Sequence, residues 1–178
     1  MLASFDTGMH NLALCVLYQE PGETEVSIWH WELIDLGTTN THGACEAIVR
    51  TLDARATQLS FVTEVALEAQ MKASMKQVAT AIQVWFLCRM PEAKSRFVSA
   101  RGKLSAVVST EKRSYAENKR LAVQECRRVL LEDTDCQCCE EGHGVAWSAF
   151  LATHDKQDDL CDAFLQGKHV LLGKRRRV

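Results

Sequence analysis

The chain has 178 residues, of which 47% are hydrophobic and 25% are charged, and its formal net charge is −2. This length and composition predict one globular domain with a substantial core and exclude a disordered or fibrous protein. No uninterrupted apolar run approaches the length of a membrane span, and no basic segment precedes the first apolar run. We therefore expect neither a membrane helix nor a secretory signal peptide. Eight cysteines in such a chain predict reduced thiols inside a cell.

The small net charge conceals an uneven distribution along the sequence. Residues 1–71 contain ten acidic and two basic residues, a net charge of −8. Residues 72–128 contain thirteen basic and four acidic residues, a net of +9, and residues 129–178 contain nine acidic and six basic residues, a net of −3. A basic middle section is typical of proteins that bind phosphates beside a carboxylate–metal centre. A solvated helix with scattered lysines and arginines would give the same pattern, so charge alone leaves both interpretations open.

Three apolar segments joined by turns occupy the start of the chain, at residues 2–6, 12–18 and 26–36. Thr7-Gly8 and Pro21-Gly22 mark the turns between them. The pattern predicts a three-stranded antiparallel meander. In the third strand, regular alternation places Trp29 and Trp31 on the same face.

From residue 44 onward, helical and strand patterns alternate. The spacing of apolar residues predicts helices over 44–59, 72–89, 114–132 and 156–172, and strands over 62–68 and 96–99. The intervening polar segments 37–43, 100–113 and 133–144 are expected to be loops. This order predicts an α/β fold, a mixed five-stranded sheet flanked by helices, and it is the element order of the ribonuclease H-like fold. We expect residues 1–178 to form a single domain with a short basic tail, Lys174–Arg177.

Four carboxylates occupy positions that suit metal binding. Asp6 ends the first strand, Glu68 ends the strand at 62–68, and Asp159 and Asp162 share a helix face at i, i+3. Acids at the ends of buried strands are unfavourable unless something pairs with them, and a hard divalent cation is one such partner. The set predicts the centre of a metal-dependent phosphodiester nuclease. Asp6 would bridge two ions, Glu68 would hold one, and Asp159 with Asp162 would complete the other.

A structural interpretation of the same acids stays open. An acid at the end of a strand often only begins a turn. Four acids of the last helix lie within about 100° of one another: Asp155, Asp158, Asp159 and Asp162. A solvated face that complements the N-terminal helix dipole would have this arrangement. Asp158 is a secondary candidate, as an outer-sphere ligand or a cap.

Four short motifs occur in order along the chain. They are Ser4–Ala13, which contains Asp6-x-Gly8 and Asn11; Leu67-Glu68-Ala69-Gln70; Val98–Arg101 with the later Tyr115–Arg120; and Lys156-Gln157-Asp158-Asp159-Leu160-Cys161-Asp162. Together they resemble the motifs of Holliday junction resolvases of the RuvC superfamily, in the branch found in poxviruses, large DNA viruses and fungal mitochondria. The resemblance covers almost the whole chain. Gln157 stands where that branch commonly has a second lysine, and the cysteine-rich insert at 136–143 lies outside the family pattern.

The resemblance implies a homodimeric, RuvC-type endodeoxyribonuclease that resolves four-way (Holliday) junctions and other branched DNA by paired nicks, in recombination or concatemer processing. It implies two Mg²⁺ ions per site, with Mn²⁺ as a substitute, held by the catalytic residues Asp6, Glu68, Asp159 and Asp162. Eight residues are predicted to contact DNA: Gln70, Lys72, Arg101, Lys103, Lys112, Lys119, Arg120 and Lys156. We expect an intracellular protein with no membrane association, in the cytoplasm or nucleus, including that of a virus-infected cell.

The broad apolar face of the helix at 72–89 is the candidate dimer surface, although burial within the monomer would explain it equally well. Two other functions fit the same residues. One is a ribonuclease H-like nuclease that acts on RNA or an RNA–DNA hybrid. The other is a non-catalytic nucleic-acid-binding protein whose acids are only part of its surface.

A cysteine-rich segment has partial zinc-ligand character through Cys136, Cys138, Cys139 and His143. Tetrahedral zinc sites use four such ligands, but a spacing of one residue between two of them is poor and no second Cys-x-x-Cys pair exists. We therefore predict a loop with free thiols rather than a zinc site. The Lys174–Arg177 tail fits a nuclear address, a DNA-binding tail or a solvated end.

Overall fold

The computed structural model describes residues 1–173 except 21–22, 24, 100–113 and 133–142. Its strands are β1 (Leu2–Thr7), β2 (Asn11–Tyr18), β3 (Ser27–Asp35), β4 (Glu64–Glu68) and β5 (Lys94–Val98). Its helices are α1 (Thr41–Ala54), α2 (Ala56–Leu59), α3 (Ala73–Arg89), α4 (Tyr115–Glu132), α5 (His143–Ala152) and α6 (Gln157–Gly173). Within these residues, every helix is too short or too polar to cross a membrane.

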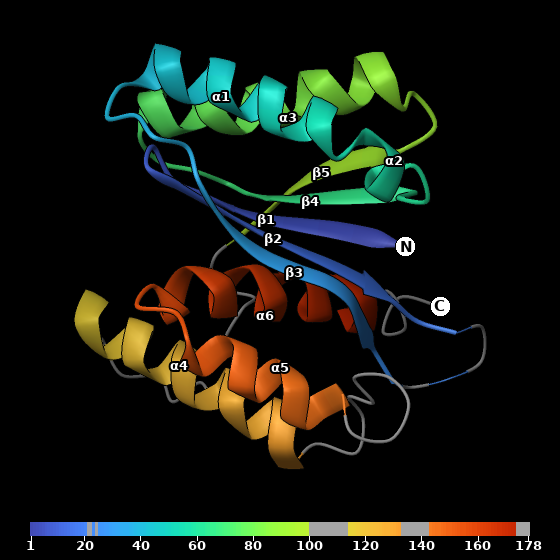
Figure 1. The fold of residues 1–178 in the computed structure, drawn as a ribbon, viewed down its shortest axis with the longest axis vertical. Helices are drawn as coiled ribbons and strands as arrows, with labels where there is room; N and C mark the ends of the chain where they lie inside the picture. The colour runs from blue at the N-terminus through green and yellow to red at the C-terminus, as the bar shows by residue number, and fades with distance from the viewer. Residues whose placement is uncertain (21–22, 24, 100–113, 133–142, 174–178) are drawn as a thin grey trace.

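The strands form one five-stranded sheet in the order β3-β2-β1-β4-β5. Antiparallel pairing joins β1 to β2 and β2 to β3, which confirms the predicted meander. Parallel pairing joins β1 to β4 and β4 to β5. Helices cover both faces of the sheet, with α1 and α3 on one side and α4, α5 and α6 on the other (Figure 1). The predicted fold class, an α/β fold with a mixed five-stranded sheet flanked by helices, is confirmed.

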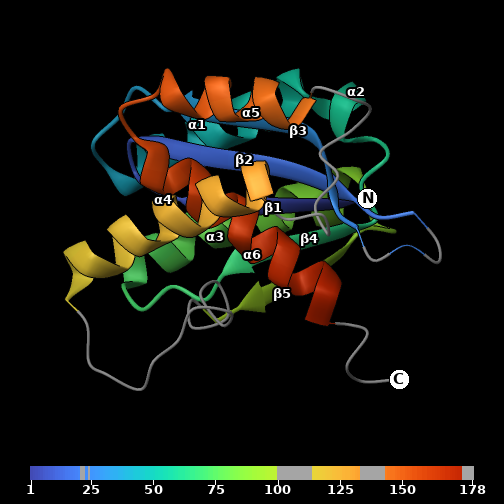
Figure 2. The ribbon, with the colours of Figure 1, turned by 90° about the horizontal axis from the view of Figure 1, so that it is seen from below.

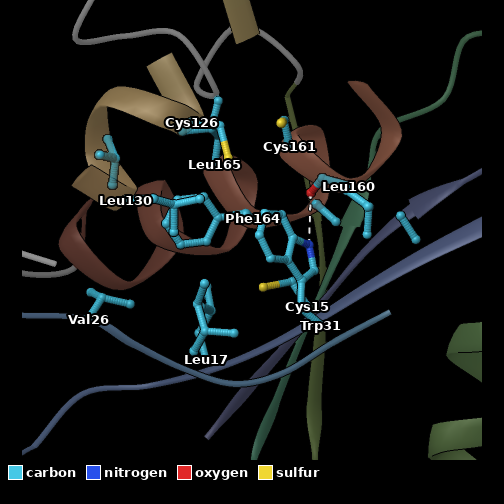
Figure 3. Close-up of a cluster of buried hydrophobic side chains, with 14 of the residues drawn as sticks. Cys15, Leu17, Val26, Trp31, Cys126, Leu130, Leu160, Cys161, Phe164 and Leu165 are labelled. Carbon is cyan, nitrogen blue, oxygen red and sulfur yellow. Dashed lines mark hydrogen bonds between the residues drawn. The ribbon is translucent and has the colours of Figure 1, made fainter. Parts of the chain in front are cut away.

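Each face of the sheet has its own hydrophobic core. Phe5 of β1 packs with Ile48 of α1 and Phe86 of α3 on one face. On the other face, α6 packs on the strands and α4 and α5 lie over the same side (Figure 2). Trp31 of β3 contacts Phe164 of α6 there, as Figure 3 shows. Because alternate residues of β1 point to opposite faces, a single strand contributes to both cores.

Several element boundaries differ from the sequence-based prediction. The first helix begins at Thr41 because Asn40 caps it, with Oδ1 accepting a hydrogen bond from the Gly43 N–H at 2.9 Å. The predicted helix over 44–59 is interrupted at Arg55, between α1 and α2. The last strand begins at Lys94, two residues earlier than predicted.

The sequence pattern does not predict helix α5, and it places the first two residues of this helix in the loop at 133–144. Its sequence, His-Gly-Val-Ala-Trp-Ser-Ala-Phe-Leu-Ala, is apolar on most sides. A helix of this kind has no polar stripe, so a period of 3.6 residues does not stand out in its sequence.

The regular alternation predicted for the third strand is interrupted at Trp29, and Trp29 and Trp31 differ strongly in burial. Val16 pairs with His30 but Leu17 pairs with Ile28, which leaves Trp29 in a β-bulge. As a result, the Trp29 side chain is 55% exposed whereas that of Trp31 is 2% exposed. The extra residue shifts the alternation that the sequence pattern assumed.

Helix α6 lies unusually close to the sheet. A Cβ atom added to Gly167 would lie 2.4 Å from Leu17 Cδ1 and 3.0 Å from Ser4 Cβ. Near the start of the helix, Trp31 Nε1 donates a buried hydrogen bond to the Leu160 carbonyl oxygen at 3.1 Å (Figure 3). These two contacts fix both the distance and the position of α6 on β1 and β2.

We expect Gly167→Ala to lower the free energy of unfolding by about 1–3 kcal/mol, because the added methyl group overpacks the contact between helix and sheet. This loss should exceed the helix-propensity gain of alanine over glycine. Gly173→Ala is a matched control, since Gly173 is the last residue of the same helix and nothing lies within 4 Å of a Cβ added to it. Urea denaturation compares the two variants, and equal stability would contradict close packing at Gly167.

A partly exposed ion pair joins β3 to the junction of α1 and α2. Arg55 Nε donates to Glu32 Oε2 at 2.8 Å, and a second bond links Arg55 Nη2 to Glu32 Oε1. His30 Nε2 lies 3.1 Å from the same carboxylate. The hydrogen bonds from Arg55 and then His30 lower the pKa of Glu32 from 4.5 to about 2.

This pair predicts a specific acid dependence of stability. A carboxyl group that is more acidic in the folded state stabilises the fold fully above pH 4.5, and the contribution is lost as pH falls towards 2. We expect Arg55→Met to lose about 1 kcal/mol at neutral pH, since the pair is partly exposed, and to lose less further stability than wild type between pH 4.5 and 2. Urea titrations across this range measure the slope, and an unchanged slope would show that the pair contributes nothing.

Candidate active site

Asp6 and Glu68 lie side by side at the carboxyl ends of two parallel strands. The register of β1 and β4 pairs Phe5 with Leu67, so each acid comes one residue later on its strand. Phe5 and Leu67 belong to the core under α1 and α3. Because side chains alternate along a strand, Asp6 and Glu68 point to the opposite face, which α6 covers. Both acids are half-buried.

The acids near the start of α6 do not form a solvated face. The side chains of Asp158 and Asp159 are only 19% and 26% exposed, and Asp162 is also partly buried. Asp155, which precedes the helix, is exposed. The interpretation as a solvated face is therefore wrong for the three acids of α6.

One pocket of about 930 Å³ brings the four predicted catalytic acids together. It is lined by Asp6 from β1, Glu68 from β4 and Asp159 and Asp162 from α6. The remaining lining residues come from the β1–β2 turn, the start of α3, the end of β5 and α4: Thr7, Gly8, Met9, His10, Asn11, Ala69, Gln70, Met71, Lys72, Met75, Ser99 and Lys119. The pocket thus combines acids with two lysines at the carboxyl ends of β1 and β4.

The turn between β1 and β2 requires glycine at position 8. The Gly8 N–H donates to the Asn11 carbonyl oxygen at 2.9 Å, and a Cβ on Gly8 would lie 2.6 Å from that oxygen. The His10 carbonyl oxygen also accepts a hydrogen bond from the Leu36 N–H at 2.7 Å. This turn is therefore held tightly next to Asp6.

Three of the eight predicted DNA-contact residues line the pocket, namely Gln70, Lys72 and Lys119. Gln70 Nε2 lies 3.2 Å from Thr7 Oγ1 and 3.4 Å from Glu68 Oε2, so it orients the glutamate, a role that the sequence did not indicate. Arg120 and Lys156 are exposed and do not line the pocket. Six predicted residues lie outside the described residues: the DNA-contact candidates Arg101, Lys103 and Lys112 and the zinc candidates Cys136, Cys138 and Cys139. The side chain of the fourth zinc candidate, His143, is also outside the described part of the chain.

Lys119 of α4 extends to the acids of α6. It forms an ion pair with Asp158, and its Nζ lies 3.9 Å from Asp159 Oδ1. Burial raises the pKa of Asp158, but the hydrogen bond and charge of Lys119 outweigh burial and leave that pKa lowered. Burial and then the charge of Asp158 raise the pKa of Asp159. The lysine therefore compensates Asp158 better than Asp159.

The four acids suit a hard divalent cation in type and in location. They supply carboxylate oxygens, the ligands that Mg²⁺ and Mn²⁺ prefer, from three elements around one pocket. Among the described residues, no three Asp, Glu, His or Cys side chains are already close enough together to hold an ion. Binding would therefore require side-chain rotation within the pocket.

Gln166 is a polar residue of α6 that the sequence analysis did not single out. Its side chain is fully buried, one helical turn after Asp162. The signal in the sequence was a glutamine whose neighbours on the helix face include the apolar residues Ala163 and Val170.

Comparison with known proteins identifies the fold. The fowlpox virus resolvase, solved with its substrate Holliday junction DNA, superposes with a TM-score of 0.64 and 18% identity over 96% of this chain and 98% of that chain. The yeast mitochondrial Holliday junction resolvase gives 0.66 and 13% identity over 98% and 82% of the two chains. RuvC of Thermus thermophilus, solved with a Holliday junction substrate, gives 0.57 and 13% identity over 98% and 94%.

This chain has the fold of the Holliday junction resolvases. No protein-family model matches the sequence, and no curated protein matches it. At 13–18% identity, the likeness to the resolvase structures establishes the architecture.

Proposed function

We propose that this protein is a structure-specific, Mg²⁺-dependent endodeoxyribonuclease that resolves four-way DNA junctions. The observation that carries the proposal is the meeting of Asp6, Glu68, Asp159 and Asp162 around one pocket in a chain with the resolvase fold. The fowlpox virus and Thermus thermophilus resolvases were both solved with Holliday junction DNA, which supports branched DNA as the substrate class. Residues 1–178 would form a single nuclease domain.

The four acids would act together as ligands for two Mg²⁺ ions, with Mn²⁺ as a substitute. Such ions, when bound, activate water and stabilise the leaving oxygen of a phosphodiester. The protein contributes rigid placement of the ligands, since two acids end central strands and two lie on a helix packed against those strands. Gln70 orients Glu68, and Asp158 stays paired with Lys119 as an outer-sphere group.

Basic and polar groups at the pocket would hold the DNA backbone. Lys72 precedes the first residue of α3, so it adds a positive charge at a helix N-terminus, where phosphates bind favourably. Lys119 would exchange its longer contact with Asp159 for a phosphate while it stays paired with Asp158. Gln70 would add a contact at the pocket. The sequence predicts further DNA contacts from the exposed residues Arg120 and Lys156, and from Arg101, Lys103 and Lys112, which lie outside the described residues. Phosphate contacts of this kind position DNA without reading its sequence.

The exposed side of α3 is the proposed homodimer surface. The broad apolar face of this helix, which the sequence suggested as the dimer surface, is instead buried in the monomer core through Val78, Ile82 and Phe86. The other leaves Val84 49% and Leu87 66% exposed, beside a groove of about 640 Å³ between α1 and α3. A four-way junction has two-fold symmetry, so a symmetric pair of active sites would produce paired nicks. The second copy of the chain is therefore the proposed occupant of this surface.

We expect the double substitution Val84→Glu with Leu87→Glu to convert a dimer into a folded monomer, because both side chains are exposed within one chain but would be buried between two. Light scattering after size exclusion measures the mass. Replacing exposed Glu92, on the loop after α3, with Gln is the control and should leave the mass unchanged. A wild-type protein that is monomeric at micromolar concentration would remove the dimer from the proposal.

We expect Asp6→Asn, Glu68→Gln, Asp159→Asn and Asp162→Asn each to reduce nicking of a synthetic four-way junction by more than about 100-fold. Loss of an outer-shell partner of a metal ligand already costs up to about 100-fold, and loss of a ligand itself should cost more. Junction binding should change little, because the lysines hold the phosphates. Asp155→Asn is the matched control, since this exposed acid lies just before α6 and does not line the pocket. The variants are compared by denaturing gel with Mg²⁺ and by binding with Ca²⁺.

The same assay separates the alternative functions when it includes a linear duplex and an RNA–DNA hybrid of identical sequence. Preferred cleavage of the hybrid would replace the proposal with a ribonuclease H-like activity. Binding of the junction without cleavage by the wild type under Mg²⁺ or Mn²⁺ would identify a non-catalytic binding protein. The intracellular location expected from the sequence remains a prediction.

A further inference from the structure

Gln166 lies on the same helical stripe as the acids of α6. Asp159, Asp162 and Gln166 are spaced i, i+3 and i+7, so they follow one another along the side of α6 that meets the sheet. Asp159 and Asp162 line the pocket, whereas Gln166 is fully buried one turn further into the protein. The amide therefore sits in the layer directly below the carboxylates.

The Gln166 amide links α6 to both strands that end in a candidate ligand. Its Nε2 lies 3.2 Å from Ser4 Oγ and 3.2 Å from the Phe5 carbonyl oxygen, both on β1. It also lies 3.3 Å from the Ala66 carbonyl oxygen on β4. Phe5 immediately precedes Asp6, and Ala66 comes two residues before Glu68. The two carbonyl oxygens can only accept hydrogen bonds, so the NH₂ group rather than the oxygen of the amide must face them.

The two ends of the Gln166 amide differ in their hydrogen bonding. Among the described atoms, Gln166 Oε1 is buried without a hydrogen-bond partner. An unsatisfied buried acceptor destabilises a protein, so what the amide contributes at this position is the contacts of Nε2 with Ser4, Phe5 and Ala66. The surrounding core is apolar, with Leu2, Phe164 and Val170 in the same cluster.

We propose that Gln166 is a positioning residue that fixes α6, and with it Asp159 and Asp162, in register with Asp6 on β1 and Glu68 on β4. The role of these four acids as metal ligands rests on the proposed function. The strands β1 and β4 and the helix α6 are distant in sequence but must present their carboxylates to shared ions. The Gln166 amide joins these three elements close to the ligands: Phe5 precedes Asp6, Ala66 comes two residues before Glu68, and Gln166 itself follows Asp162 by one helical turn. Groups that orient metal ligands in this way set the affinity of the site for metal.

The test compares wild type, Gln166→Met and Ile48→Val. Methionine keeps the length of the side chain and removes the N–H donors. Ile48→Val removes a methylene group from the core on the opposite face of the sheet and controls for a general loss of stability. Calorimetric titration with Mn²⁺ alone measures metal affinity, and hydrogen–deuterium exchange measures the rigidity of residues 157–163 in the metal-free protein.

We expect Gln166→Met to weaken Mn²⁺ binding by about tenfold to a hundredfold, to lower kcat for junction cleavage and to leave KM for the junction unchanged. We also expect faster amide exchange at the start of α6 in this variant. Ile48→Val should match wild type in all of these properties. Wild-type metal affinity and exchange in Gln166→Met would overturn the positioning role.

The same measurements distinguish failure of the nuclease proposal from failure of the Gln166 inference. If wild type binds no Mn²⁺ and cuts no junction, the nuclease proposal fails, and the metal-binding part of the Gln166 inference fails with it. Amide exchange still decides whether the amide holds α6 in register. If wild type binds metal and cuts junctions while Gln166→Met behaves identically, only the inference about Gln166 is overturned.

Discussion

Gly167 brings the backbone of α6 against Ser4 and Leu17, and the candidate site depends on this contact. Without a side chain at this position, the helix lies close enough for Gln166 to reach the backbone of β1 and β4. The same approach carries Asp159 and Asp162 to the pocket that Asp6 and Glu68 line. A small residue and a buried amide, adjacent in sequence, therefore place acids from opposite ends of the chain in one pocket.

The two faces of the sheet have different roles. The face under α6 and α4 carries the acids and Lys119, whose ion pair with Asp158 keeps positive charge next to a concentration of negative charge. On the other face, α1 and α3 pack a hydrophobic core against the sheet, and α3 exposes Val84 and Leu87 on its outer side. Helix α3 connects these tasks, since Lys72 precedes it at the pocket and its other end borders the groove proposed for a second copy.

Much of the fold was predictable from local signals, because the strand and helix periods of β1, β2, β4, α3, α4 and α6 are regular. The acids were predictable because strand ends and an i, i+3 spacing are visible in sequence. The bulge at Trp29 and the apolar helix α5 were missed, since a bulge breaks the period and an apolar helix has none. The roles of Gln70 and Gln166 were missed because they depend on contacts with Glu68, Phe5 and Ala66, which only the packed structure brings near.

Anomalous diffraction from crystals soaked in Mn²⁺ would show whether these four acids form one metal centre. We expect peaks inside the pocket within about 2 Å of carboxylate oxygens, the ligand distance of a hard octahedral cation. The ligands should come from both strands and from α6, and Asp158 should remain with Lys119. Absence of any peak between Asp6, Glu68, Asp159 and Asp162 in crystals that take up Mn²⁺ elsewhere would contradict the account.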